Sequence, residues 1–334
     1  MNILVTGGTG YIGSHTTVEL IKAGHTVEIL DNLFNSKIEV LDNIEKITGV
    51  KPKFYKVDLL DYPATLQVLK DTKFDAVIHF AGMKAVGESV EKPLTYYENN
   101  IQGTINLLKA MGEAGVKKLV FSSSATVYGD KGDKSGELVE TMTTGVGITN
   151  PYGWTKAMIE QIIRDVAVAD PKFEATILRY FNPVGADKSG LIGEDPNGIP
   201  NNLMPIVTKV YQGKIEKLVI YGNDYATEDG SCKRDFIHVT DLAKGHIAAL
   251  THMEPGVAIY NLGSGKATSV FEIVDAFEKL SEKELPKMVG NRRAGDLAVV
   301  CANPSLAHER LSWKTELTIE DAIRDTLNYL KNNS

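Results

Sequence analysis

Tyr152 and Lys156 carry side chains whose spacing suits acid–base chemistry. If a helix begins after Asn150-Pro151, residues four positions apart lie on one face, so the phenol and the ammonium become neighbours. A free tyrosine has a pKa near 10 and is almost wholly protonated at neutral pH, which makes it a poor base. A nearby cation lowers that pKa by stabilising the phenolate. The pair therefore predicts a tyrosine that exchanges a proton with a substrate hydroxyl.

The spacing alone is a weak signal, because a chain with 13 tyrosines is expected to hold about one such match by chance. The place of the pair in the chain strengthens it. The preceding apolar run, 118–122, leads into the hydroxyl side chains of Ser122 and Ser124, and ligands bind at the carboxyl ends of strands in parallel sheets. Ser124 is expected either to relay a proton to Tyr152 or only to position the substrate. The alternative is an ordinary strand-to-loop transition.

A second candidate site lies at the start of the chain, where four glycines between residues 7 and 13 follow the apolar run 2–6 and open a helical pattern. Such glycines let the backbone turn tightly and approach a pyrophosphate, while amide groups at the helix start face the anion. A glycine-rich turn without a ligand is the alternative, but the strand before it and the helix after it favour a dinucleotide site. The residues of this turn are Gly7, Gly10, Tyr11, Ile12 and Gly13.

Asp31 ends the second predicted strand, where a carboxylate is expected to accept hydrogen bonds from the adenosine ribose. No arginine precedes Arg164, so the usual partner of a ribose 2′-phosphate is missing, and Lys37 is the only cation near Asp31 in the sequence. Both observations favour NAD over NADP as cofactor. A capping or turn aspartate is the alternative for Asp31.

These candidate residues need a scaffold of alternating strands and helices. Short β-branched apolar runs alternate with helical patterns in the first half of the chain, which predicts a parallel sheet wrapped by helices. The predicted strands are 2–6, 26–31, 53–57, 75–80, 118–122 and 175–179. The predicted helices are 12–23, 61–71, 92–115 and 151–169. The fold class is therefore α/β, a Rossmann-type doubly wound parallel sheet.

Beyond Asn182 the pattern becomes less regular, and Gly, Pro and Asn become frequent up to residue 205. We interpret this part as a smaller mixed α/β domain that binds the substrate. The segment 236–250 has the pattern of a strand followed by a helix and is expected to return to the first domain. The predicted division is a dinucleotide-binding domain, 1–181 with about 236–260, and a substrate-binding domain, 182–235 with 261–334.

Composition argues against several other classes of protein. A hydrophobic fraction of 43% is ample for a core, and a net charge of −7 disfavours nucleic acid or an anionic membrane as the main partner. Cys232 and Cys301 are too few for a disulfide framework or a cysteine metal site, so we expect no metal and a reducing, cytoplasmic compartment. We also expect neither a signal peptide nor a membrane span, because the first residues and the apolar runs lack those patterns.

A set of short segments resembles the extended short-chain dehydrogenase/reductase family, and within it the UDP-glucose 4-epimerases, along essentially the whole chain. The family-wide segments are the glycine turn, Asp58-Leu59, 79–82 (His-Phe-Ala-Gly), Asn99, 122–124 (Ser-Ser-Ser), Tyr152 with Lys156, and 179–183 (Arg-Tyr-Phe-Asn-Pro). Those typical of the epimerases are 84–90 (Lys-Ala-Val-Gly-Glu-Ser-Val), 124–129 (Ser-Ala-Thr-Val-Tyr-Gly), 198–205 (Gly-Ile-Pro-Asn-Asn-Leu-Met-Pro) and 222–225 (Gly-Asn-Asp-Tyr).

The resemblance implies NAD that stays bound through turnover. It implies adenosine contacts at Asp31, Asn32, Asn35, Ser36, Asp58 and Leu59. It implies that the rest of the cofactor path is lined by Tyr11, Ile12, Phe80, Ala81, Gly82, Lys84, Asn99, Ser122, Tyr152, Lys156 and Tyr180.

On the substrate side, Arg234 and Arg293 resemble the family's diphosphate contacts, and planar guanidinium groups suit that role. Surface solvation is the alternative for an isolated arginine. The resemblance further implies amide contacts at Asn182 and Asn202, a segment near the uracil at Tyr221, and a ribose contact at Asp296. The other implied substrate contacts are Lys84, Ser124, Tyr152, Phe181, Leu203 and Val300.

Val300 departs from part of the family pattern, because some members carry a bulky tyrosine there that narrows the sugar pocket. A smaller side chain predicts room for a 2-acetamido group, and hence activity on UDP-N-acetylglucosamine and its galacto epimer. The alternative is that neighbouring residues fill the space, because protein cores rarely tolerate voids.

The implied activity is reversible 4-epimerisation of UDP-glucose and UDP-galactose through a transient 4-keto sugar and bound NAD. A nucleotide-sugar 4,6-dehydratase is one alternative, but it needs acid–base carboxylates where this chain has Ala125 and Thr126. A non-catalytic NAD-binding regulator is another, disfavoured by intact Tyr152, Lys156 and Ser124. Helices 92–115 and 151–169 resemble the family's dimer-forming pair, which implies a homodimer.

Overall fold

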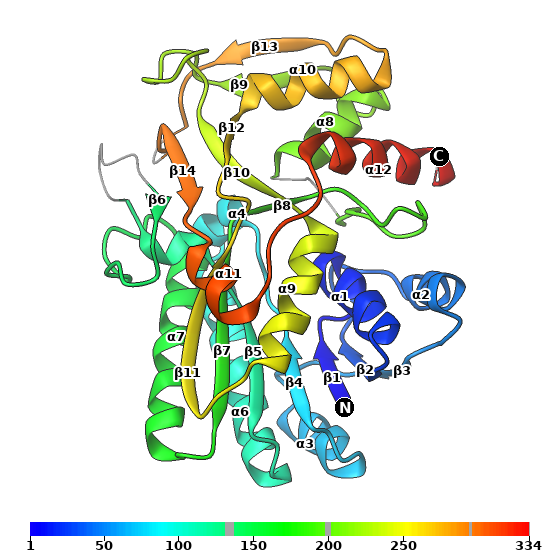
Figure 1. Cartoon of the computed structure of the whole chain (residues 1–334), viewed down its shortest axis with the longest axis vertical. Helices are drawn as coiled ribbons and strands as arrows, with labels where there is room; N and C mark the ends of the chain where they lie inside the picture. Colours follow the sequence, from blue (N-terminus) through cyan, green and yellow to red (C-terminus); the bar gives the residue numbers. More distant parts are fainter. Residues whose placement is uncertain (131–136, 198–201, 294–295, 334) are drawn as a thin grey trace.

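The structure of the protein is a computed structural model that describes residues 1–130, 137–197, 202–293 and 296–333 (Figure 1). Its central element among these residues is a seven-stranded sheet in the order β11-β7-β5-β4-β1-β2-β3, with every neighbouring pair parallel. The strands are β1 (Asn2–Thr6), β2 (Thr26–Asp31), β3 (Lys53–Lys56), β4 (Ala76–His79), β5 (Lys118–Ser124), β7 (Glu174–Tyr180) and β11 (Gly256–Leu262). The predicted fold class is confirmed.

Helices cover both faces of this sheet, because its strands alternate apolar side chains between two cores. In β1, Leu4 packs into one core while Ile3 and Val5 pack into the other, and all three are fully buried. The first face is covered by α3 (Tyr62–Asp71), α6 (Gly103–Ala114) and α7 (Pro151–Ala169). The second face is covered by α1 (Tyr11–Lys22), α9 (Val239–Thr251) and α11 (Ser305–Leu311).

The strand order reverses beside β1, which lies between β2 and β4. Chain segments leaving the carboxyl ends of β1 and β4 therefore diverge to opposite sides, which opens a crevice at that edge of the sheet. This crevice is where the glycine turn, the end of β4 and the serines of β5 meet.

A second group of elements packs above this edge and has its own core (Figure 1). Its helices are α8 (Leu203–Tyr211), α10 (Val270–Ser281) and α12 (Ile319–Asn332). Its strands are β6 (Glu137–Leu138), β8 (Asn182–Val184), β9 (Leu218–Tyr221), β10 (Lys233–His238), β12 (Ala267–Ser269), β13 (Lys287–Gly290) and β14 (Val299–Ala302). β10 is the centre of this group, since it pairs with β8, β12 and β14.

The segment predicted to return to the first domain divides between the two groups. β10 belongs to the upper sheet, whereas α9 packs on α1 and β11 forms the edge of the large sheet. The division of the chain into two domains stays a prediction.

The predicted helix 92–115 is confirmed, since the chain is helical from Pro93 to Ala114, but it contains an irregular turn. It consists of α5 (Pro93–Tyr97), a π-helical turn over Glu98–Gln102, and α6. The side chain of Asn100, inside that turn, bonds the backbone of Met83 in both directions, 2.8 Å from its amide and 3.0 Å from its carbonyl. A π turn widens the helix locally, which orients Asn100 toward the loop after β4. Two further helices were not predicted, α2 (Val40–Thr48) and α4 (Val86–Glu91).

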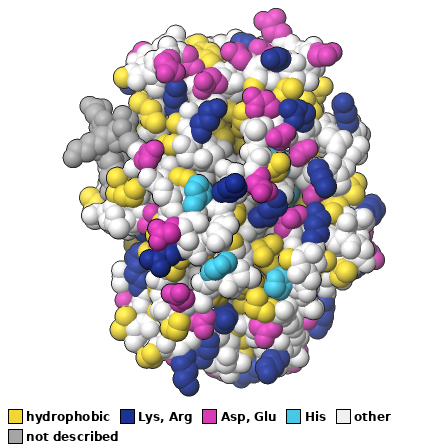
Figure 2. All heavy atoms as spheres, in the orientation of Figure 1, with side chains coloured by type: hydrophobic (Ala, Val, Ile, Leu, Met, Phe, Trp, Pro, Cys, Tyr) yellow, Lys and Arg dark blue, Asp and Glu magenta, His cyan; other side chains and the backbone are white. Residues whose placement is uncertain are grey.

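Acidic and basic side chains are interspersed over the face shown in Figure 2, without a broad field of one sign. The negative net charge is thus not concentrated on this face. Among the described helices, none combines the length and the apolar content that crossing a membrane would require.

Candidate active site

A cavity of about 1830 Å³ opens between the carboxyl edge of the large sheet and the upper group of elements. Every residue predicted for the site lines this cavity. Pockets for single small ligands are typically ~300–1,000 Å³, so the volume suits two nucleotides held together. Of the matched segment 198–205, residues 198–201 lie outside the described residues, as do residues 294–295 between Arg293 and Asp296.

The glycine turn forms the floor of one end of the cavity. Gly7 has φ +71°, and a Cβ there would lie 2.7 Å from the Ala81 amide nitrogen. A Cβ at Gly13 would lie 2.2 Å from the Gly7 carbonyl oxygen. The helix that follows, α1, starts at Gly10 without a side-chain cap and without an acidic residue in its first turn. Its free amides thus face the cavity with nothing to compete against an anion.

Asp31 lies at the carboxyl end of β2, beside the glycine turn. Its carboxylate accepts hydrogen bonds from the Thr9 amide at 3.2 Å and from the Leu33 amide at 2.9 Å. Close by, the Asn32 amide donates to Asp58 at 2.9 Å, which joins the ends of β2 and β3. The predicted adenosine contacts therefore stand together at one wall of the cavity.

These features fit a dinucleotide. The glycine turn has no space for side chains at the place where a pyrophosphate would lie. The amides at the start of α1 are uncapped, and the Asp31 carboxylate lies at the end of β2. Lys37, the cation nearest Asp31 in the sequence, instead pairs with Asp195. The wall beside Asp31 thus suits a ribose diol better than a ribose phosphate.

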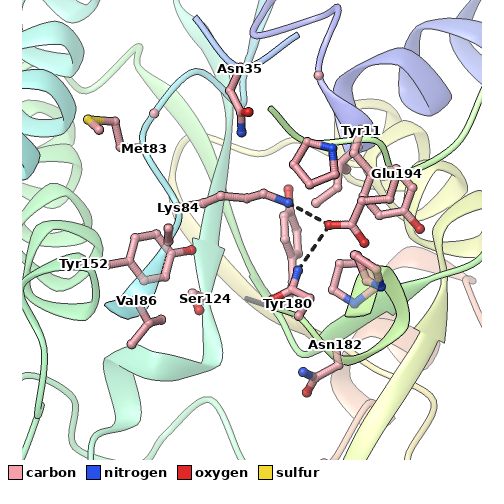
Figure 3. Close-up of a pocket in the computed structure, with 18 of the residues that line it drawn as sticks. Tyr11, Asn35, Met83, Lys84, Val86, Ser124, Tyr152, Tyr180, Asn182 and Glu194 are labelled. Carbon is pink, nitrogen blue, oxygen red and sulfur yellow. Dashed lines mark hydrogen bonds and ion pairs between the residues drawn. The ribbon is translucent and has the colours of Figure 1, made fainter. Parts of the chain in front are cut away.

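Tyr152 lies in the first turn of α7, on the other side of the cavity (Figure 3). That helix starts there because Asn150 accepts from the Gly153 amide at 2.8 Å and Pro151 occupies its first position. Lys156, one turn on, donates to the Ser122 carbonyl at 2.6 Å, and its Nζ is 5.9 Å from the centre of the Tyr152 ring. The helix thus brings phenol and ammonium to the end of β5.

Burial acts on the protonation of both groups. It raises the pKa of the Tyr152 phenol above its ordinary value, and a hydrogen bond with Ser124 opposes that rise. It lowers the pKa of Lys156 to about 8, against the opposite effect of the Glu160 carboxylate. Lys156 therefore remains mostly cationic at neutral pH. A further positive charge beside Tyr152 is needed before the phenolate becomes its favoured form.

Ser124 ends β5 and begins a 3₁₀ turn over Ala125–Tyr128. Its Oγ accepts from the Thr126 amide at 3.2 Å and from the Thr126 hydroxyl at 3.0 Å. Because both bonds use Ser124 as acceptor, its own hydroxyl proton is left to donate to Tyr152 or to a bound substrate. Thr126 is thus a site residue that the sequence reasoning missed, although a hydroxyl two residues after a serine is a signal for such a turn.

The loop that follows β4 lies between the cofactor end and the substrate end of the cavity. Asn100 holds Met83 of this loop and also donates to the Thr155 hydroxyl of α7 at 3.1 Å. The Tyr180 hydroxyl bonds the Nε2 atom of His246, a buried side chain on α9. Both contacts tie the cavity wall to the helices that cover the sheet.

The upper wall of the cavity carries the predicted diphosphate contacts. Asp296 lies between the two arginines, 3.4 Å from Arg234 and 3.0 Å from Arg293. The Arg293 guanidinium lies 4.9 Å from the centre of the Tyr221 ring. One acid between two guanidinium groups leaves a net positive charge, which suits a bound diphosphate.

Val300 stands on β14 directly beside Arg234, its partner in the parallel pairing with β10. The side chain lines the same cavity as Tyr152 and Asn182. The site therefore combines a phenol, a serine hydroxyl and a neutral wall between two anion-binding ends. Such an arrangement can remove the proton of one hydroxyl group and return it, on a substrate that is held by its phosphates.

Glu194 was also missed. It extends into the cavity between the two ends, and the side chain of Lys84 points toward it (Figure 3). No local sequence pattern marks this residue, because its ion-pair partner Lys84 lies 110 positions away along the chain.

The family profile that matches the sequence is described as the NAD dependent epimerase/dehydratase family and covers residues 3–263. A UDP-glucose 4-epimerase of Yersinia enterocolitica is 52% identical over 333 residues, which span 100% of this chain and 98% of that protein. The UDP-glucose 4-epimerase structure from Bifidobacterium longum, in complex with NAD+ and UDP, has a TM-score of 0.95 at 49% identity and covers 100% and 99% of the two chains. The corresponding structure from Stenotrophomonas maltophila, with bound NAD and formylated UDP-arabinopyranose, has a TM-score of 0.96 at 44% identity, with 100% and 98% covered.

Proposed function

The chain belongs to the NAD dependent epimerase/dehydratase family, and from that premise we propose that it interconverts UDP-glucose and UDP-galactose by inverting carbon 4 of the sugar. The observation that carries the proposal is one cavity in which Tyr152 and Ser124 stand between a glycine turn and the Arg234–Arg293 pair. Relatives with this activity match over the full length of the chain.

In this reaction Tyr152 removes the proton of the C4 hydroxyl, directly or through Ser124. When bound, NAD would supply a reversible hydride acceptor for carbon 4 and a positive charge that favours the Tyr152 phenolate. Loss of the hydroxyl proton and of the C4 hydride leaves a 4-keto sugar. Return of the hydride to the opposite face of carbon 4, and of the proton to the oxygen, restores the alcohol with inverted configuration. No reductant or oxidant is consumed in the cycle.

The chain's residues have three further tasks in this scheme. Lys156 contributes a positive charge that favours the Tyr152 phenolate. Ser124, held as an acceptor by Thr126, donates toward the sugar. Arg234 and Arg293 hold the diphosphate while the keto sugar turns about its link to it, which requires a firm anchor and looser sugar contacts.

The test uses the purified protein and UDP-galactose without added cofactor. We expect conversion to UDP-glucose without a net change in the absorbance of reduced nicotinamide, because hydride leaves and returns within one cycle. A dehydratase would instead release a 4-keto-6-deoxy sugar, and a non-catalytic NAD-binding protein would leave UDP-galactose unchanged. The neighbours of Ser124, Ala125 and Thr126, offer no carboxylate for dehydration.

The proposal extends to the acetamido sugars. Val300 supports it, because a valine on the cavity wall leaves more space than a tyrosine would. We expect turnover of both UDP-N-acetylgalactosamine and UDP-galactose, and we expect Val300→Tyr to lower kcat/KM for the acetamido sugar by roughly 100-fold through overpacking. The same variant should change kcat/KM for UDP-galactose by less than about fivefold.

Steady-state assays with the two sugars decide this prediction. Val300→Leu, which adds bulk without the ring, serves as the matched control and should fall between the two proteins. Absence of acetamido turnover by the unaltered chain would contradict the proposal.

The proposal includes a homodimer and a cytoplasmic location. Helices α4, α5 and α7 expose Val90, Leu94 and Met158, and Leu94 is 80% exposed. Apolar side chains gathered on neighbouring helices favour a protein partner, and a second copy of the chain is the proposed one. The cysteines, free and buried, suit a reducing compartment.

Leu94→Asp is expected to shift the protein from dimer to monomer, because it places a charge in the proposed apolar interface. Light scattering coupled to gel filtration measures the mass. Val50→Asp, an exposed valine on the far side of the large sheet between α2 and β3, should leave the mass unchanged. A single-chain mass for the unaltered protein at micromolar concentration would refute the dimer.

A further inference from the structure

Residues 191–197 form a strap that crosses from the upper group of elements to the cofactor end of the cavity. Leu191 accepts a hydrogen bond from Asn43 of α2 at 3.1 Å, and the Asn197 amide donates to Asn35 at 2.9 Å. Both partners lie in the segment that follows β2. The strap therefore lies across the wall where Asp31 and its neighbours stand.

The first part of the strap is anchored by packing. Ile192 is 3% exposed and joins the apolar cluster of Val18, Ile29, Leu41 and Ile44. Gly193 lies so close to Tyr329 of α12 that a Cβ there would meet the ring at 2.7 Å. Apolar burial thus holds this part of the strap in place without any ligand.

Glu194 follows this anchor, and its side chain is 9% exposed although it faces the cavity. One carboxylate oxygen accepts from Lys84 Nζ at 3.0 Å and from Asn202 Nδ2 at 3.2 Å (Figure 3). Lys84 comes from the loop after β4, at the cofactor end, and Asn202 directly precedes α8, at the substrate end. Glu194 therefore joins side chains from both ends.

An unpaired carboxylate in a cavity that binds phosphates would repel them, so its negative charge must be compensated. Glu194 is neutralised by Lys84, whose ammonium also lies over the Tyr11 ring at 5.9 Å. An ammonium has three N–H donors and an amide NH₂ has two, so one bond each to Glu194 leaves both partners able to donate again. The contact orients Lys84 and Asn202 and leaves each of them N–H donors for a ligand.

We propose that Glu194 is a positioning residue that holds Lys84 and Asn202 in place, so that the strap keeps the dinucleotide in the cavity between turnovers and the nucleotide sugar finds a preformed site. The proposal rests on the proposed function for its substrate. The retention of cofactor is separate, because it is measured without turnover.

The test compares Glu194→Ala and Glu194→Gln with the unaltered holoenzyme. We expect the alanine variant to release NAD about tenfold faster, and the KM for UDP-galactose to rise about tenfold, as for the loss of a hydrogen bond to a charged group. The value of kcat should change by less than about twofold, since the carboxylate stabilises binding and not the transition state. Glutamine keeps an acceptor for both donors, so we expect it to restore part of each effect.

NAD release is followed by gel filtration and by the nicotinamide content of the denatured protein. Glu316 provides a matched control, because it pairs with Lys244 at the same 3.0 Å distance but is 59% exposed and lies away from the cavity. Glu316→Ala should leave NAD release and KM unchanged. If Glu194→Ala does not fold, the glutamine variant decides alone.

Unchanged NAD release and KM in both Glu194 variants would overturn the proposal. So would slower release or a lower KM, which would mean that the carboxylate competes with phosphates for Lys84. A fall in kcat at constant KM would also overturn it, because it would assign Glu194 to the chemical step. Failure of the unaltered protein to convert UDP-galactose would overturn the proposed function instead and leave the NAD measurement valid.

Discussion

Replacement of Tyr152 by phenylalanine is expected to lower kcat for UDP-galactose by roughly 10³-fold or more, because it removes the group that takes the C4 proton. The phenyl ring keeps the packing at the start of α7, so the variant should fold and retain NAD. Burial by itself opposes the phenolate, since it raises the pKa of Tyr152. The reaction thus depends on the positive charges that gather beside this side chain.

The measurement is kcat and KM by steady-state assay, with bound NAD determined in parallel. Tyr62→Phe is the control, because Tyr62 lies on α3 outside the cavity and bonds only surface groups such as Glu113. The control should retain kcat within about twofold. Near-normal turnover by the Tyr152 variant would refute the assigned role. If that variant loses both NAD and its fold, the Ser124→Ala variant is tested instead. We expect kcat of that variant to fall roughly 10-fold to 100-fold.

Replacement of Arg179 by methionine is expected to lower the free energy of unfolding by about 3–5 kcal/mol. Arg179 and Glu160 form an ion pair whose side chains are each 1% exposed, with bonds of 2.9 and 2.7 Å. The Ser123 hydroxyl donates to the same carboxylate at 2.6 Å. Without Arg179, the buried Glu160 loses its main positive partner, because Arg164 contacts it only at 3.3 Å and is partly exposed.

The double variant Arg179→Met, Glu160→Leu shows whether the loss of stability comes from the unpaired charge of Glu160 or from the absence of the ion pair itself. We expect it to recover most of the lost stability, because two apolar side chains can replace a buried ion pair. Denaturant titration measures the free energy of unfolding. Arg310→Met, which breaks the exposed pair with Glu309, should change it by less than about 0.5 kcal/mol. A double variant as unstable as the single one would contradict this account.

The same pair connects the fold to the chemistry. Glu160 lies one helical turn beyond Lys156 and two beyond Tyr152, on the same face of α7. Arg179 belongs to β7 and also donates to Tyr128, in the turn that follows Ser124. Its removal therefore affects both elements that carry the catalytic side chains, and we expect kcat of Arg179→Met to fall with its stability.

Several features of the protein were predictable because their physical cause lies within a few residues. The glycine turn after β1, the helix start at Asn150-Pro151, and the alternation of apolar side chains in β1 are local properties. The π turn inside the helix at 92–115 was not predicted, and it has a tertiary origin, since it serves the contact of Asn100 with Met83. Periodicity averages over such a turn and cannot reveal it.

What the sequence by itself determined, then, is the strand and helix pattern, the dinucleotide turn and the spacing of Tyr152 and Lys156, because hydrophobic period, glycine content and helix geometry act over short distances. Only the tertiary structure decided that Glu194 meets Lys84, 110 positions away, and that Arg179 neutralises Glu160. These contacts arise when loops, helices and strands distant in the chain become neighbours in the fold, and a buried charge is then stable only with a partner.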